Sequence, residues 1–164
     1  MRWTSLDREP CSMARTLAVV GDRWTMLVLR DAFMGIRRFD DFEQDLKIAR
    51  RVLAERLALL VKEGVLRKEA YQEKPTRYEY RLTDKGLALY PAILSLVHWG
   101  DRYYAGKKGV PVIHTHLKCG HDFRSVLTCS ECGEALDARG VTFRAGPGAA
   151  IRAGRSRSKT AARR

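Results

Sequence analysis

Three of the four cysteines of this 164-residue chain lie in its C-terminal third, interleaved with histidines. Two short segments, HLKCG (residues 116–120) and CSECG (residues 129–133), each place two metal-ligating side chains three positions apart and follow them with glycine. A glycine with positive φ lets such a turn fold tightly around its ligands. Four thiolate or imidazole ligands are what a tetrahedral structural Zn²⁺ requires. The spacing therefore predicts a zinc site formed by His116, Cys119, Cys129 and Cys132.

Other interpretations of the same residues stay open. His114 or His121 could replace His116 as the nitrogen ligand, although the spacing of His116 mirrors that of the cysteine pair. The three thiols could be reduced and free of metal. Cys129 and Cys132 could form a redox pair, but no thioredoxin-like βαβ pattern surrounds them. A closed set of four ligands leaves no position for water, so the predicted zinc site is structural.

The fourth cysteine, Cys11, stands at the predicted start of a helix, with Arg8 and Arg15 close to it in sequence. A helix N-terminus and neighbouring cations form the setting in which protein thiols become reactive. The alternative is a small packing residue without chemistry, and no second cysteine lies nearby in sequence to resolve an oxidised one. Cys11 is therefore a candidate redox-sensing residue.

Composition narrows the class of protein. Hydrophobic residues make up 45% and charged residues 30%, a globular balance. The formal charge of +12 favours a polyanionic partner. Half of that excess lies in the last fourteen residues, where Ile151 is the only large apolar side chain, so we expect a disordered basic tail. No apolar run approaches the roughly 20 residues of a membrane span, and no secretory signal is evident, so we expect a cytoplasmic protein.

Hydrophobic periodicity predicts the elements that position these residues. Short helices are expected from Cys11 to Val20 and, after a cap at Asp22, up to Gly35. Helices over Phe39–Leu46 and Ala49–Glu63 follow, joined by a brief turn. Two helices in this arrangement are typical of a helix-turn-helix.

A hairpin should follow the helix-turn-helix directly, as a wing does. Strands are expected over Val65–Tyr71 and Arg77–Leu82, with Gln72–Thr76 as the loop between them. A long helix is then expected from residue 84 to 106, with a kink or break at Pro91.

The predicted fold is mainly α with a small β wing, plus a small C-terminal zinc-ribbon-like module. Within that module, β-like pieces are expected at Val110–Ile113 and Val141–Phe143. The expected divisions are an N-terminal arm over 1–10, the winged helix-turn-helix over 11–106, the Cys/His module over 107–146 and the basic tail over 147–164.

The outer face of the second helix of the helix-turn-helix carries small and hydrogen-bonding side chains, as a helix in the major groove needs. Solvated helices look similar, but the adjacent wing favours DNA as the partner. Basic residues before the helix-turn-helix and at the wing tip are placed to reach phosphates or the minor groove. The predicted DNA-contacting residues are Arg37, Arg38, Arg50, Arg51, Ala54, Glu55, Lys74 and Arg77.

The chain resembles the HxlR-type family of bacterial transcriptional regulators, relatives of the MarR-type winged-helix proteins. The resemblance runs from about Cys11 to Asp101. It rests on the order and spacing of the blocks CSMARTLAVVGDRWTMLVLRD, RRFDDFEQDL, RRVLAERLALLVKEGVLRK, RYEYRLTDKG and WGD.

The resemblance implies a homodimer that binds double-stranded operator DNA, with repression as the expected outcome and an oxidant or small molecule as the expected kind of effector. The first and last core helices would carry the dimer contact, and the two reading helices would lie about 34 Å apart. Some family members sense oxidants through a cysteine at the position of Cys11. One departure is Ala49, which stands where a small polar residue often caps the reading helix.

An enzyme is not expected, because the sequence shows no nucleophile–base pair, no Gly-rich phosphate loop and no HExxH motif. The deaminase signature is also incomplete, since Thr128 rather than proline precedes Cys129. An RNA-binding or protein-scaffolding module built on the Cys/His segment and the basic tail stays as the second hypothesis.

Overall fold

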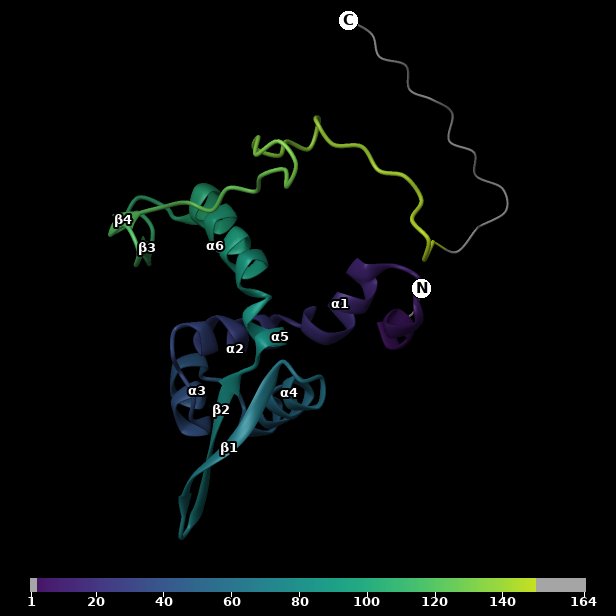
Figure 1. Ribbon diagram of the computed structural model, residues 1–164. Helices are drawn as coiled ribbons and strands as arrows, with labels where there is room; N and C mark the ends of the chain where they lie inside the picture. The colour runs from purple at the N-terminus through teal and green to yellow at the C-terminus, as the bar shows by residue number, and fades with distance from the viewer. Residues whose placement is uncertain (1–2, 150–164) are drawn as a thin grey trace, which may run out of the picture.

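The computed structural model describes residues 3–149, so residues 150–164 of the predicted disordered tail lie outside the described part of the chain (Figure 1). A 3-10 helix, η1, covers Trp3–Arg8. The α-helices are α1 (Ser12–Val20), α2 (Arg23–Phe33), α3 (Phe39–Leu46), α4 (Arg50–Lys62), α5 (Asp84–Leu87) and α6 (Tyr90–Tyr104). The strands are β1 (Leu66–Glu73), β2 (Thr76–Leu82), β3 (Thr115–His116) and β4 (His121–Asp122). No helix within residues 3–149 is long and apolar enough to span a bilayer.

Side-chain caps mark two of the predicted helix starts. The Asp22 carboxylate accepts hydrogen bonds from the backbone N–H groups of Trp24 and Thr25 at 3.0 and 3.2 Å, which satisfies free donors at the start of α2. The Thr83 hydroxyl accepts from the Gly86 N–H at 3.1 Å at the start of α5. Ala49 precedes α4 without any side-chain cap, as its residue type dictates.

The core lies where α2, α3 and α4 meet the start of the hairpin. Their inward side chains are fully buried, and those of α4 recur every three or four residues, which confirms its predicted inward face. The fully buried apolar residues of these helices are Val28, Leu29, Phe42, Leu53, Leu57 and Leu60. This packing fixes α4 by one face and leaves the other face available.

The wing is longer and its turn tighter than predicted. Antiparallel pairing runs from Leu66↔Leu82 to Glu73↔Thr76, so the expected loop over Gln72–Thr76 is wrong and only two residues separate the strands. Local hydrogen bonds close the tip, because the Thr76 hydroxyl donates to the Glu73 carbonyl at 3.0 Å. A register irregularity between Ala70 and Gln72 takes up the extra residue of β1.

The predicted long helix is interrupted, as expected near Pro91. Ala88 and Leu89 separate α5 from α6, and Pro91 occupies the first turn of α6. Proline is well suited to that turn because its missing N–H would have had no partner within the helix.

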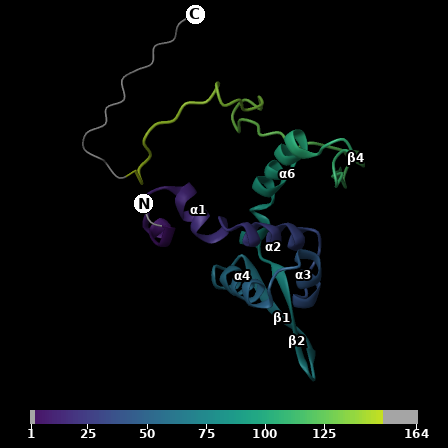
Figure 2. The same ribbon diagram turned by 180° about the vertical axis from the view of Figure 1, so that it is seen from behind.

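The strands expected at Val110–Ile113 and Val141–Phe143 are wrong, since neither segment forms a strand. Paired strands in this part of the chain are confined to β3 and β4. Apolar alternation alone does not make a strand, because a ladder needs a partner. From residue 123 to 149 the chain runs as a C-terminal arm that passes α6 and then turns back, so that its yellow end lies near the N-terminus and α1 (Figures 1 and 2).

Candidate nucleic-acid interface

The outer face of α4 points to solvent at the end of the molecule remote from α6 and the C-terminal arm (Figure 1). Arg51 is the most exposed of the predicted contact residues on this helix, with 90% of its side chain accessible. Its Nε lies 3.0 Å from Glu55 Oε1, one helical turn further on. Ala54 and Ala58 are exposed beside them and add little bulk. This face can approach base edges closely and offers both a donor and an acceptor.

Arg50 is held differently from Arg51. Its guanidinium contacts Asp40 Oδ1 at 3.4 Å, pairs with the Glu43 carboxylate and lies over the Phe39 ring at 4.8 Å. All three partners belong to α3. Arg50 therefore joins the two helices of the helix-turn-helix, whereas Arg51 is bound only within α4.

Arg56 was absent from the sequence-based prediction, although it connects α4 to the rest of the core. Its Nε lies 3.0 Å from Asp22 Oδ1, the oxygen that caps α2. The signal in the sequence was weak, because Arg56 lies between the inner and outer faces of α4 and a helical wheel assigns it to neither. The Arg56–Asp22 ion pair connects α4 to the start of α2.

The predicted residues Arg37 and Arg38 lie where the segment before α3 meets the wing. The Tyr80 N–H donates to the Arg37 carbonyl at 2.8 Å, and Arg38 forms an isolated antiparallel bridge with Glu79. The Arg38 guanidinium also lies over the Tyr71 ring at 4.6 Å. These contacts attach the wing to the helix-turn-helix and leave both arginines exposed.

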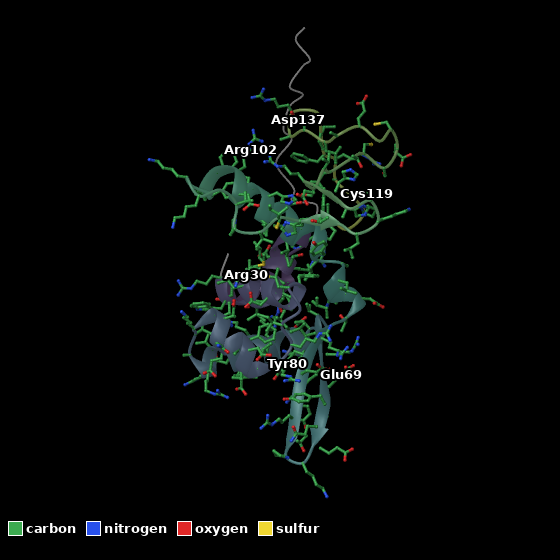
Figure 3. The ribbon with its side chains drawn as sticks, turned by 90° about the vertical axis from the view of Figure 1, so that its left-hand side faces the viewer. Arg30, Glu69, Tyr80, Arg102, Cys119 and Asp137 are labelled. Carbon is green, nitrogen blue, oxygen red and sulfur yellow. The ribbon has the colours of Figure 1, made fainter. Side chains whose placement is uncertain are left out.

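Positive charge is distributed unevenly along the wing. Near its base, Arg81 pairs with Glu79 at 2.7 Å and with Glu69 at 3.1 Å, and the hydrogen bond to Glu79 raises the pKa of Arg81. At the tip, Lys74 and Arg77 are exposed. Figure 3 shows the hairpin projecting beyond the helices, with Glu69 and Tyr80 on the part nearer the core. The wing is thus neutralised at its base and cationic at its tip.

A buried carboxylate on α2 takes part in an ion-pair network that reaches α3. Asp31 on α2 is fully buried, and burial raises its pKa although Arg30 acts in the opposite direction. Arg30 Nε donates to Asp31 Oδ1 at 2.7 Å, and the same guanidinium reaches Asp45 on α3 at 3.1 Å. This network links α2 to α3. Because burial raises the pKa of Asp31 in the folded state, protonation of this carboxylate is coupled to folding.

Cys11, the candidate redox-sensing residue, is exposed and occupies the N-cap position of α1 in an extended conformation. Its backbone carbonyl accepts from the Arg15 N–H at 3.0 Å. A diffusible oxidant can therefore reach the thiol at the start of this helix.

The predicted zinc ligands form two separate pairs, which we name the first ligand turn (residues 116–120) and the second ligand turn (residues 129–133). In the first, His116 Nδ1 lies 3.2 Å from Cys119 Sγ. In the second, backbone N–H groups of Cys132 and Glu131 point at Cys129 and lower its pKa. Within residues 3–149, no three His, Cys, Asp or Glu side chains are grouped closely enough to hold a metal. A single chain therefore does not bring the predicted four ligands together.

Comparison with known proteins identifies the family of the winged core. Residues 19–108 match the family described as HxlR-like helix-turn-helix. An uncharacterized HTH-type transcriptional regulator of Mycobacterium tuberculosis is 44% identical over 137 residues, covering 84% of this chain and 87% of that protein. The alignment is too long to end with the winged core, so it includes part of the C-terminal arm.

Solved structures of regulators share the fold. The crystal structure of PA1607, a candidate transcription factor, is 35% identical with a TM-score of 0.76 and covers 85% of this chain and 98% of that one. The redox regulator HypR in its oxidized form is 31% identical with a TM-score of 0.53, covering 56% of this chain and 96% of that one.

Proposed function

The chain belongs to the HxlR-like helix-turn-helix family, and from that premise we propose that it acts as a homodimer whose two copies of α4 read an operator in double-stranded DNA. It is a DNA-binding transcriptional regulator of the helix-turn-helix type. The observation that carries the proposal is the division of α4: Leu53, Leu57 and Leu60 are fully buried, while Arg51 is almost fully exposed. A helix held in this way can enter the major groove without disturbing the core.

The exposed residues suggest a division of labour. Arg51 has the geometry to donate to a guanine edge, with Glu55 orienting it or accepting from cytosine. Ala54 allows close approach. Arg50 reaches the backbone from the α3–α4 junction, and Arg37 and Arg38 do so from the loop before α3. At the wing tip, Lys74 and Arg77 contact phosphates or the minor groove.

Two helices expose the apolar surface that a dimer would bury. On α1, Met13 and Leu17 face solvent, and on α6 so do Leu96, Trp99 and Tyr103. A monomer rarely leaves so many large apolar side chains in solvent. We propose that these first and last core helices form the two-fold contact, which would place the α4 helices about 34 Å apart on successive major grooves.

The regulatory outcome proposed is repression, because a dimer that covers an operator excludes other proteins from it. Oxidation or alkylation of the exposed Cys11 is proposed to change operator affinity. The redox regulator HypR shares this fold and supports a thiol-based response.

The proposal is tested by selecting binding sites from a pool of random duplexes with the full-length protein. We expect enrichment of an inverted repeat whose binding resists salt better than binding to random DNA, since phosphate contacts alone weaken steeply with salt. Structured RNA serves as the competitor for the second hypothesis. Equal retention of RNA and of every duplex would contradict sequence-specific DNA binding.

A further inference from the structure

The first ligand turn has the geometry of a metal-binding knuckle. Gly120 has a φ of +70°, and its N–H donates to the His116 carbonyl at 2.8 Å. The pairing His116↔His121 closes the turn into a short hairpin. An added Cβ at Gly120 would meet no atom within 4 Å, so glycine is needed there for its backbone conformation and not for space.

The second ligand turn repeats this geometry with a different sequence. Gly133 has a φ of +75°, and its N–H donates to the Cys129 carbonyl at 2.9 Å. An isolated antiparallel bridge between Thr128 and Ala135 closes the hairpin. Both turns thus present their two ligands from the same three-residue spacing and the same hydrogen-bonded frame.

Each turn supplies half of a tetrahedral set. Zn–S and Zn–N bonds of about 2.3 and 2.0 Å place two ligand atoms of one tetrahedral ion about 3.5 Å apart. His116 Nδ1 and Cys119 Sγ lie 3.2 Å apart, so a small outward movement would admit the ion. The rings of His114 and His116 both pack against Phe123, but His114 also packs against His98 on α6, whereas His116 Nδ1 lies beside Cys119 Sγ. Two further ligands must come from elsewhere.

The two ligand turns of one chain are held on different sides of α6. Figures 1 and 2 show β3 and β4 on one side of that helix and the light green segment of the C-terminal arm, around residue 130, on the other. The connection is anchored to α6, because His98 Nδ1 lies 2.9 Å from both the N–H and the hydroxyl oxygen of Ser125. The Phe123 ring packs against His98 as well. Ser125 lies between the two turns in sequence, so this anchor restrains the segment that joins them.

We propose that zinc is bound between two copies of the chain, with the first ligand turn of one protomer and the second ligand turn of its partner completing each site. The inference rests on the homodimer of the proposed function. A two-fold axis that brings one such pair together brings the other together as well, so the dimer holds two identical ions. Each ion is coordinated by three thiolates, which lose their protons on binding, and one imidazole, with no position left for water.

Exposed apolar residues on the C-terminal segment and on α6 favour a second copy as the occupant. Leu117 in the first ligand turn is 97% exposed, and Phe143 on the C-terminal arm is 96% exposed. Trp99 and Tyr104 on α6 are also exposed. Large apolar side chains left in solvent in this way are expected to pack on another copy, and the bound zinc would fix that contact.

The test uses two full-length variants, His116→Ala/Cys119→Ala and Cys129→Ala/Cys132→Ala, carrying different affinity tags and co-expressed. Bound zinc is measured by elemental analysis after tandem purification of the mixed dimer. We expect one zinc per chain in the unaltered protein and none in either variant alone. The mixed dimer should contain half a zinc per chain, because one of its two sites keeps all four ligands. A mixed dimer without zinc, or unaltered protein without zinc, overturns the proposal.

Two further measurements keep the outcome interpretable. If a double variant loses its helical circular dichroism, the mixing is repeated with Cys119→Ser and Cys132→Ser, for which the same half-occupancy is expected. Light scattering and operator binding are recorded on the unaltered protein. A dimer that binds operator but holds no zinc refutes the metal site alone, whereas a monomer refutes the proposed dimer together with it.

Discussion

Arg56 Nε on α4 lies 3.0 Å from Asp22 Oδ1, the same carboxylate oxygen that caps α2. The Asp22 side chain therefore caps α2 and also forms an ion pair with α4, the helix proposed to read DNA. The ion pair therefore links the outer helix α4 to the start of α2, in addition to the buried leucines that pack α4 on the core.

Two substitutions of Asp22 should distinguish the contribution of the helix cap to stability from that of the ion pair. Asp22→Ala removes both and should lower the free energy of unfolding by about 1–3 kcal/mol. Asp22→Asn keeps a good cap and removes only the charge, so it should cost less than about 1 kcal/mol. Chemical denaturation of both variants measures the difference, and equal losses would show that the cap contributes little.

The buried carboxyl of Asp31 should make stability depend on pH. Burial raises its pKa above the ordinary 3.8, so the folded state binds this proton more tightly than the unfolded state. Its contribution is complete below pH 3.8 and is lost as the pH rises through the raised value. The free energy of unfolding of the unaltered protein should therefore fall relative to that of Asp31→Asn over this range. Asp41→Asn, at an exposed carboxylate outside this network, is the control, and parallel pH profiles for all three proteins would contradict the assignment.

Lys74 at the wing tip should contribute affinity without sequence preference. Lys74→Ala should weaken binding to all duplexes alike and reduce the slope of log affinity against log salt by about one. Lys107→Ala removes an equally exposed lysine beyond α6, far from the wing, and should leave the slope unchanged. A loss confined to the preferred operator would instead assign Lys74 to base recognition.

Cys11 should carry the response to oxidants. Operator titrations with and without peroxide should differ for the unaltered protein and coincide for Cys11→Ser. Zinc content is followed in the same samples, since oxidation of the ligand-turn thiols is the competing cause. An identical peroxide response in both proteins would exclude Cys11 as the sensor.

The sequence predicted the winged core well because its signals are local. Asp22 caps α2, Thr83 caps α5 and the buried leucines of α4 recur at helical spacing, and each of these rules concerns residues within a few positions of one another. The error at the wing tip arose because all of Gln72–Thr76 was assigned to a loop, whereas cross-strand pairing continues to Glu73 and Thr76 and leaves a turn of two residues.

Contacts between residues that are far apart in the sequence could not be predicted from local patterns. Arg56 meets Asp22 across more than thirty positions, and nothing in either neighbourhood predicts the pair. The same limit applied to Val110–Ile113, whose apolar residues suggested a strand that has no partner. The ligand turns were recognised from spacing, but spacing does not say which chain supplies each half of the set.

The proposed docking of α4 is tested most directly by methylation interference on the selected operator. Methyl groups at guanine N7 in the major groove should block binding in two half-sites one helical turn apart. Arg51→Ala should remove that sensitivity at one symmetric position per half-site and weaken specific binding by about 1–3 kcal/mol. Interference confined to the minor groove, or a pattern unchanged by Arg51→Ala, would contradict the assignment of α4 as the reading helix.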